Sequence, residues 1–134
     1  MTEASDIIES YLQIRRVISA ICLANGDLSH EERVILASSI GGASNLTSDQ
    51  IKILIKDSED SPDIKQLVKD IKFSGQIKQL LVDLSALAVI KVDWHSTEIV
   101  AAHEAIEALP LEESAREGFV KAFDLLRNIS QALE

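Results

Sequence analysis

Two acidic turns, each lying between an apolar stretch and a new helix, contain the side chains best suited to bind a metal ion. The first turn carries Asp27 and Glu32, and the second carries Asp93 and Glu98, each 66 positions after its counterpart. Four converging carboxylates would repel one another unless a hard divalent cation, calcium or magnesium, bridged them. If the two turns meet about a pseudo-twofold axis, these four residues predict a pooled cation site.

Neither turn is an EF-hand calcium loop. That loop requires carboxylates at the first and third of its twelve positions. With Glu32 in the twelfth position, those two residues are Ile21 and Leu23. A simpler interpretation competes with the cation site: Glu32 and Glu98 complement the dipoles of the helices they begin, and the two aspartates only shape the turns. The capping box Ser29-x-x-Glu32 favours this simpler interpretation.

No catalytic or cofactor-binding group is predicted, and we expect a protein that is not an enzyme. Cys22, the only cysteine, lies in an apolar helix without an assignable histidine partner, so a structural role is favoured over that of a nucleophile. His103 lies on the apolar side of a helix, where we expect a hydrogen-bonded histidine rather than a ligand. Trp94, the only tryptophan, either plugs the core or anchors a partner.

The composition indicates a soluble, cytoplasmic protein. The formal net charge is −9, and binding to nucleic acid or to an anionic membrane requires clustered Lys and Arg, which this chain lacks. The most apolar stretch, Leu80–Val92, contains Asp83 and Lys91 and is too short to span a bilayer, so we expect no membrane insertion. Acidity suits a cation or a basic protein partner.

The spacing of the apolar residues predicts an all-α fold with about seven helices and no strand. The Ile77–Val92 helix is apolar around most of its circumference, so we expect it to be the buried, central one. The expected helices span about Glu3–Ala24, Ser29 to Gly41-Gly42, the stretch after the capping box Thr47-x-x-Gln50, Ser61-Pro62 to Ile71, Gln76–Val92, Ser96–Leu109, and Glu112 onward, with a polar loop at Asp57–Ser61.

Because the two turns share one design, we interpret the chain as a single domain, residues 1–134, with a degenerate internal repeat whose halves cover about residues 5–60 and 62–134. The motif around each turn resembles the TerB-like family of tellurite-resistance proteins, which carry a repeated Ala-x-Ala-Asp-Gly followed by a small polar residue and a glutamate. The match in the first half consists of Ala24, Gly26, Leu28, Ser29 and Glu32, and in the second half of Ala88 and Glu98.

The sequence also departs from the family motif. Asn25 replaces the family aspartate in the first turn, and Lys91 and Val92 stand where the second Asp-Gly would be. The resemblance implies an all-helical, non-enzymatic module that binds a protein partner in a stress or tellurite-resistance context. It also implies divalent-cation binding as an alternative function, and the departures weaken that alternative.

Overall fold

The computed structural model describes the backbone of residues 3–133 and the side chains of residues 11–133. Within this range the chain is all-helical, with seven helices and no strand, as the sequence predicts. The helices are α1 (Glu3–Cys22), α2 (His30–Ala43), α3 (Ser48–Asp60), α4 (Ile64–Lys69), α5 (Ser74–Ile90), α6 (Ser96–Glu107) and α7 (Glu113–Ala132).

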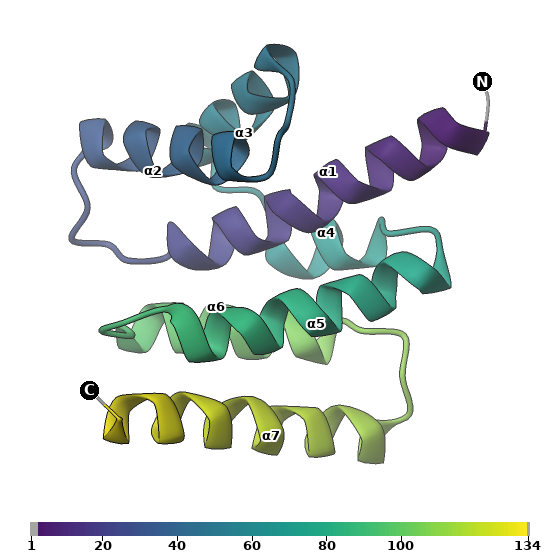
Figure 1. Ribbon diagram of the computed structural model, residues 1–134, viewed down its shortest axis with the longest axis vertical. Coiled ribbons are helices and arrows are strands. Elements are labelled where there is room, and N and C mark those ends of the chain that lie inside the picture. Colours follow the sequence, from purple (N-terminus) through teal and green to yellow (C-terminus); the bar gives the residue numbers. More distant parts are fainter. Residues whose placement is uncertain (1–2, 134) are drawn as a thin grey trace.

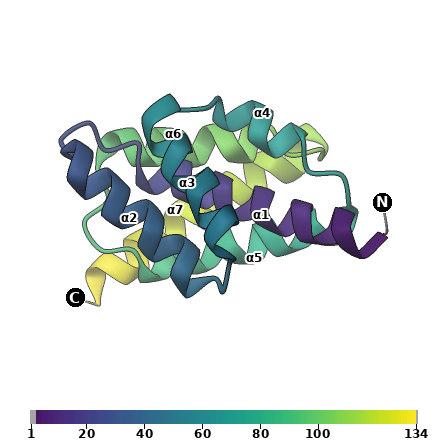
Figure 2. The ribbon, with the colours of Figure 1, turned by 90° about the horizontal axis from the view of Figure 1, so that it is seen from above.

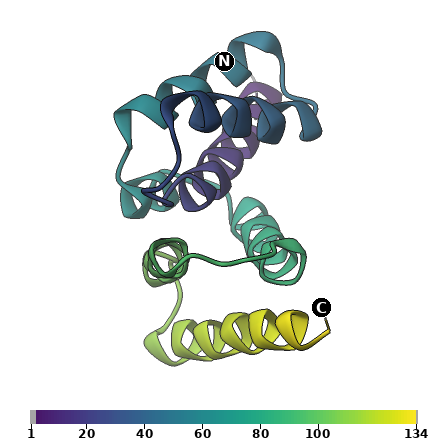
Figure 3. The same cartoon turned by 90° about the vertical axis from the view of Figure 1, so that its left-hand side faces the viewer.

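The helices are stacked in tiers (Figures 1 and 3). The pair α2–α3 covers α1 and α4, the pair α5–α6 lies beneath them, and α7 forms the outermost tier at the other end. Seen from above, α1 runs through the middle of the molecule (Figure 2). It contacts α2, α3, α4, α5 and α6, so α1 is the helix about which the others are arranged.

The expectation that Ile77–Val92 would be the central helix is therefore wrong. Helix α5 packs on α1 on one side and on α7 on another, and its buried residues are Ile77, Leu80, Leu84 and Ala88. Leu81 and Leu87 pack against the rim of the core, whereas Val82 and Ile90 are 60% and 74% exposed. Apolar residues around most of the circumference of α5 did not predict its burial on all sides, because this helix lies at the edge of its tier.

Two of the predicted helix starts are confirmed in detail. Ser29 caps α2 and Thr47 caps α3, each through a capping box in which the cap and the third helical residue, Glu32 or Gln50, bond each other's backbone N–H. Helix α2 ends at Ala43, one residue beyond the expected end at Gly41-Gly42. Gly41 permits close packing: a Cβ there would lie 2.6 Å from a side-chain atom of Ile51 on α3.

The expected start of the fourth helix at Ser61-Pro62 is also wrong. Ser61 ends α3 in a left-handed conformation, with φ of 49°, and Asp63 caps α4 by accepting from the N–H of Lys65. Apart from the end of α3, the other helix ends of the sequence prediction agree with the structure within two residues, which is the usual uncertainty of helix boundaries.

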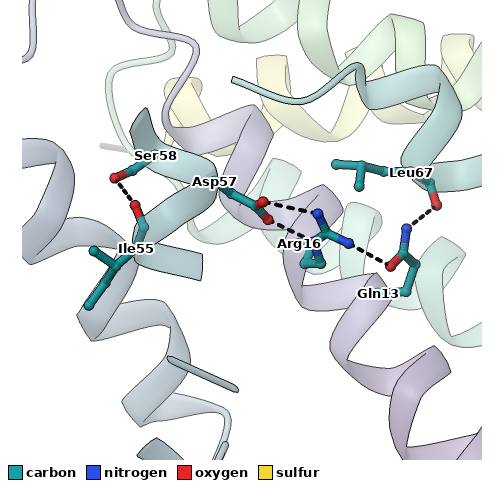
Figure 4. A network of polar contacts seen from close by, with 6 residues as sticks. All are labelled: Gln13, Arg16, Ile55, Asp57, Ser58 and Leu67. Atoms are coloured by element: carbon teal, nitrogen blue, oxygen red, sulfur yellow. Dashed lines mark hydrogen bonds and ion pairs between the residues drawn. The ribbon is translucent and has the colours of Figure 1, made fainter. Parts of the chain in front are cut away.

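The predicted polar loop at Asp57–Ser61 is instead the last turn of α3 and its cap, and it is fastened to α1 (Figure 4). Arg16 donates to both carboxylate oxygens of Asp57, at 2.7 and 2.9 Å, and also donates to Gln13, whose amide donates to the carbonyl of Leu67. The hydrogen bond to Asp57 raises the pKa of Arg16 further. One face of α1 thereby holds α3 and α4, and this pairing explains why Asp57 can be buried.

Candidate functional site

The turn between α5 and α6, which contains two of the four predicted cation ligands, has a tightly specified backbone. Asp93 adopts the left-handed conformation, with φ of 57°, which an aspartate tolerates better than most residues. His95 then caps α6: its ring Nδ1 accepts from the N–H of Thr97, and its own N–H donates to Glu98 at 2.7 Å. The helix begins at Ser96, as the sequence predicts, and the 66-residue spacing makes its cap His95 the counterpart of Ser29.

Glu98 is a buried carboxylate with both oxygens engaged. Its side chain is 3% exposed, one oxygen accepts from the backbone of His95, and the other lies 2.8 Å from the ammonium of Lys91. Lys91 is itself only 19% exposed. The lysine that follows α5 therefore neutralises the glutamate that begins α6, and the pair closes the turn between the two helices.

One polar contact links the two acidic turns, both of which lie within the described residues. The carboxylate of Asp27, which is exposed, lies 3.5 Å from Nε2 of His95. Glu32 is also exposed and serves its capping box, in which the hydrogen bonds with Ser29 lower its pKa. Asp93 is exposed at its left-handed position. These placements agree with the capping interpretation of the turns.

The convergence of Asp27, Glu32, Asp93 and Glu98 that the repeat suggested is not observed. Across residues 11–133, no three His, Cys, Asp or Glu side chains form a group suited to a metal ion. Glu98 is instead paired with Lys91 in the interior, while Asp27, Glu32 and Asp93 lie at the surface. Calcium or magnesium binding by these four residues stays a prediction without geometric support.

Trp94 joins this turn to the core. Its ring meets the ring of Phe123 edge to face, with centroids 5.5 Å apart. Lys91 Nζ lies 5.5 Å from the centre of the Trp94 ring, and the guanidinium of Arg127 lies 5.9 Å from it. The indole N–H is buried and has no hydrogen-bond partner among the described residues. Of the two interpretations of Trp94, this geometry favours the plug that closes the core.

A polar cluster on the same side links α6 to α7. His103 Nε2 lies 2.8 Å from Oδ1 of Asp124, and Arg127 donates to that same oxygen at 2.9 Å. Burial acts to raise the pKa of Asp124, but the hydrogen bonds with Arg127 and His103 outweigh it and hold the pKa below its ordinary value. The expectation that His103 is hydrogen-bonded is confirmed.

Asp124 and Arg127 were not predicted as site residues, because His103, which lies against Asp124, and Trp94, which lies against Arg127, come from other parts of the chain. The only signal was their spacing, since residues three apart on a helix are neighbours. In the structure Asp124 and Arg127 lie side by side on α7, and the carboxylate of Asp124 faces His103 of α6.

Cys22, at the end of α1, carries a thiol that is poorly suited to nucleophilic chemistry. Burial raises its pKa to about 11, and the negative charge of Glu98 acts in the same direction, while Lys91 partly opposes both. A reactive cysteine needs the opposite setting, an exposed position with net positive surroundings. The structural role expected for Cys22 agrees with this environment.

We expect the native thiol of Cys22 to react about 100-fold more slowly with iodoacetamide at neutral pH than the thiol of the unfolded chain, because two pKa units separate their thiolate fractions. Alkylation rates in buffer and in urea, measured by mass spectrometry, test this. In the control variant Cys22→Ser/Ser39→Cys the cysteine is at an exposed position of α2, and native and unfolded rates should agree within a few-fold. A native Cys22 that reacts as fast as this control contradicts the prediction.

The chain matches no protein-family model, no curated protein and no solved structure. Among residues 3–133, no helix has both the length and the apolar character that crossing a bilayer requires.

Proposed function

We propose that the protein is a non-enzymatic interaction module of the TerB-like kind, which binds a partner protein through the surface at the end of α5. This surface, the α5-end surface, consists of Ile90, Val92 and Asp93. The observation that carries the proposal is the exposure of two large aliphatic side chains, 74% for Ile90 and 55% for Val92, on either side of a lysine that is tied down by Glu98.

Rigid presentation makes such side chains effective contacts. Ordering flexible side chains and loops at an interface costs free energy, and a segment that is already fixed avoids that cost. Here the Lys91–Glu98 pair and the capping box of α6 fix the backbone on which Ile90 and Val92 stand. The surface therefore offers two aliphatic contacts that are already held in place before a partner binds.

Charge indicates the chemistry of the partner. The chain has a net charge of −9, and within the α5-end surface Asp93 is exposed while Lys91 is neutralised. Complementary charge speeds association and discriminates between partners. We infer a partner with an apolar contact patch surrounded by basic residues, and the resemblance to TerB-like proteins suggests a cytoplasmic stress or tellurite-resistance setting.

The environments of the reactive side chains support a role without catalysis. The thiol of Cys22 is held protonated by burial, Glu98 is committed to Lys91, and His103 is committed to Asp124. An enzyme needs a nucleophile or base that is free to act on a substrate. These three candidates are instead engaged in holding α1, α6 and α7 together.

Affinity purification with the tagged full chain tests the proposal. We expect a specific partner that is retained by the wild type and by Ile35→Asp, and lost with Ile90→Asp. Ile35 is a matched control, since it is 65% exposed on α2, far from the α5-end surface along the chain. Unchanged thermal melting of both variants confirms folding, and a basic partner should dissociate as salt rises. A partner that Ile90→Asp retains, or no partner at all, contradicts the proposal.

A further inference from the structure

Helix α7 carries an exposed row of uncharged residues that the fold leaves uncovered. We call this row the α7 seam. Its members recur at alternating steps of three and four residues, so that they lie along one side of the helix. Every member is exposed. They are Ala115, Gly118, Ala122, Leu125, Ile129 and Ala132.

The seam lies on the outermost tier of the molecule (Figures 1 and 3). The other side of α7 packs on α5 and α6, where Phe123 is fully buried. Leu125 and Ile129, by contrast, are 59% and 47% exposed. Alternating steps of three and four apolar residues form the contact line of paired helices, so α7 has one such line that is used in the fold and a second that is free.

The order of side-chain sizes in the seam is self-complementary. From the N-terminal end it reads small, small, small, large, large, small. We propose that a second copy of this chain docks here, with its α7 antiparallel to the first, about a twofold axis that passes midway between residues 123 and 124. Leu125 then meets the partner's Ala122, and Ile129 meets the partner's Gly118. Ala132 meets the partner's Ala115, and each of these contacts occurs twice, as the symmetry requires.

This pairing fits large side chains against small ones throughout. A parallel arrangement would instead place Leu125 against the partner's Leu125, where the two side chains would be crowded. It would place Gly118 against the partner's Gly118, where a gap would remain. Close packing without voids favours the antiparallel arrangement. Antiparallel helices also place opposite dipole ends side by side.

The absence of charged residues from the α7 seam favours docking of a second copy at this face. Two chains of net charge −9 repel each other, so they approach at least cost where neither presents carboxylates. The seam contains no charged residue, and the exposed residues of α5, which borders it, include no acid. The three acids of α7 lie outside the seam: Asp124 lies against His103, and Glu113 and Glu117 line a groove with Arg116 and Lys121.

The area of the face suits a dimer of modest affinity. Ser130, next to Ile129, donates to the carbonyl of Val89 at 2.6 Å, so this part of α7 lies beside α5, on which Val82 and Val89 are exposed. Together these side chains form an apolar patch on the order of several hundred Å², at the upper end for a protein that stays monomeric. A stable interface buries about 800 Å² per partner, so we expect dissociation in the micromolar range.

Sedimentation at protein concentrations from about 1 to about 200 μM tests the proposal. We expect the mass to rise from 14.7 kDa towards twice that value, and at a lower concentration when salt screens the net charge. Ile129→Glu should abolish the rise, and Ile53→Glu, at a residue 40% exposed on α3, should preserve it. A wild type that stays monomeric, or a dimer that tolerates Ile129→Glu, overturns the proposal.

Cross-linking tests the orientation, in a chain whose Cys22 is replaced by serine. The double variant Ala115→Cys/Ala132→Cys should form an intermolecular disulfide under mild oxidation, because the two positions face each other across the interface. The single variant Ala132→Cys should not, since the two copies of that position lie at opposite ends. Cross-linking of the single variant as fast as the double one overturns the antiparallel arrangement.

This inference does not rest on the proposed function, and the two can fail separately. Ile90→Asp lies outside the α7 seam and should leave the sedimentation unchanged. If Ile129→Glu instead removes a different protein from an affinity purification while the wild-type chain sediments as a monomer, the seam binds that protein and the second copy is excluded.

Discussion

Replacing Lys91 by methionine is expected to lower the free energy of unfolding by about 3–5 kcal/mol. Methionine preserves the apolar part of the side chain but removes the ammonium 2.8 Å from Glu98. The carboxylate, only 3% exposed, would then be buried without a counter-charge. A buried charge that loses its partner destabilises far more than the intact pair stabilises. Urea denaturation followed by circular dichroism measures the change.

Two further variants separate this effect from others. Lys91→Met/Glu98→Gln should recover most of the loss, because glutamine carries no charge and still serves in the capping box of α6. Lys52→Met, which removes a well-exposed lysine 3.9 Å from Asp49, should cost less than about 0.5 kcal/mol. If Lys91→Met costs no more than Lys52→Met, the pair does not hold the α5–α6 turn.

Phe123→Ala should destabilise the protein by about 3–5 kcal/mol, the range for a fully buried phenylalanine. The ring packs against Trp94 and His103, at centroid distances of 5.5 and 6.2 Å, so its removal leaves a cavity where α6 and α7 meet the turn. For a chain of this length the melting temperature should fall by about 10–20 °C. Calorimetry measures this fall.

The fluorescence of Trp94, the only tryptophan, provides a second readout of that variant, since its emission should shift to the red as water reaches the ring. Phe119→Ala, at a half-buried position one turn earlier on α7, is the control and should cost less than half as much. Equal effects of the two variants would show that Phe123 has no special place in the core.

The features predicted correctly from the sequence are those that depend on neighbours in the chain. The capping boxes at Ser29 and Thr47 need only residues three apart, and the helical class follows from apolar spacing. The errors concern features that depend on distant partners. Gly41 is needed because Ile51 of α3 lies against it, and Asp57 can be buried because Arg16 of α1 binds it.

The candidate site shows the same division. The spacing of the two turns marked Glu98 as important, and the structure does give that residue an unusual environment. Its partner was also visible, because Lys91 stands where the second Asp-Gly of the family motif would be. The burial of both side chains could not be predicted from residues nearby in the chain, because it depends on how α5 and α6 pack on α1 and α7. That burial turns a suspected ligand into half of an ion pair.

The division of the core into two clusters bears on how the molecule opens. Leu23, Ala37 and Leu54 form a small cluster beneath α2 and α3, separate from the large cluster that joins the other helices. Polar contacts from α1 and α2, above all Arg16 with Asp57, fasten this end of the molecule. A unit with a small core of its own and few ties can detach while the rest stays folded. Amide protons of α2 and α3 would then exchange through sub-global opening, and those of α1 and α7 only through complete unfolding.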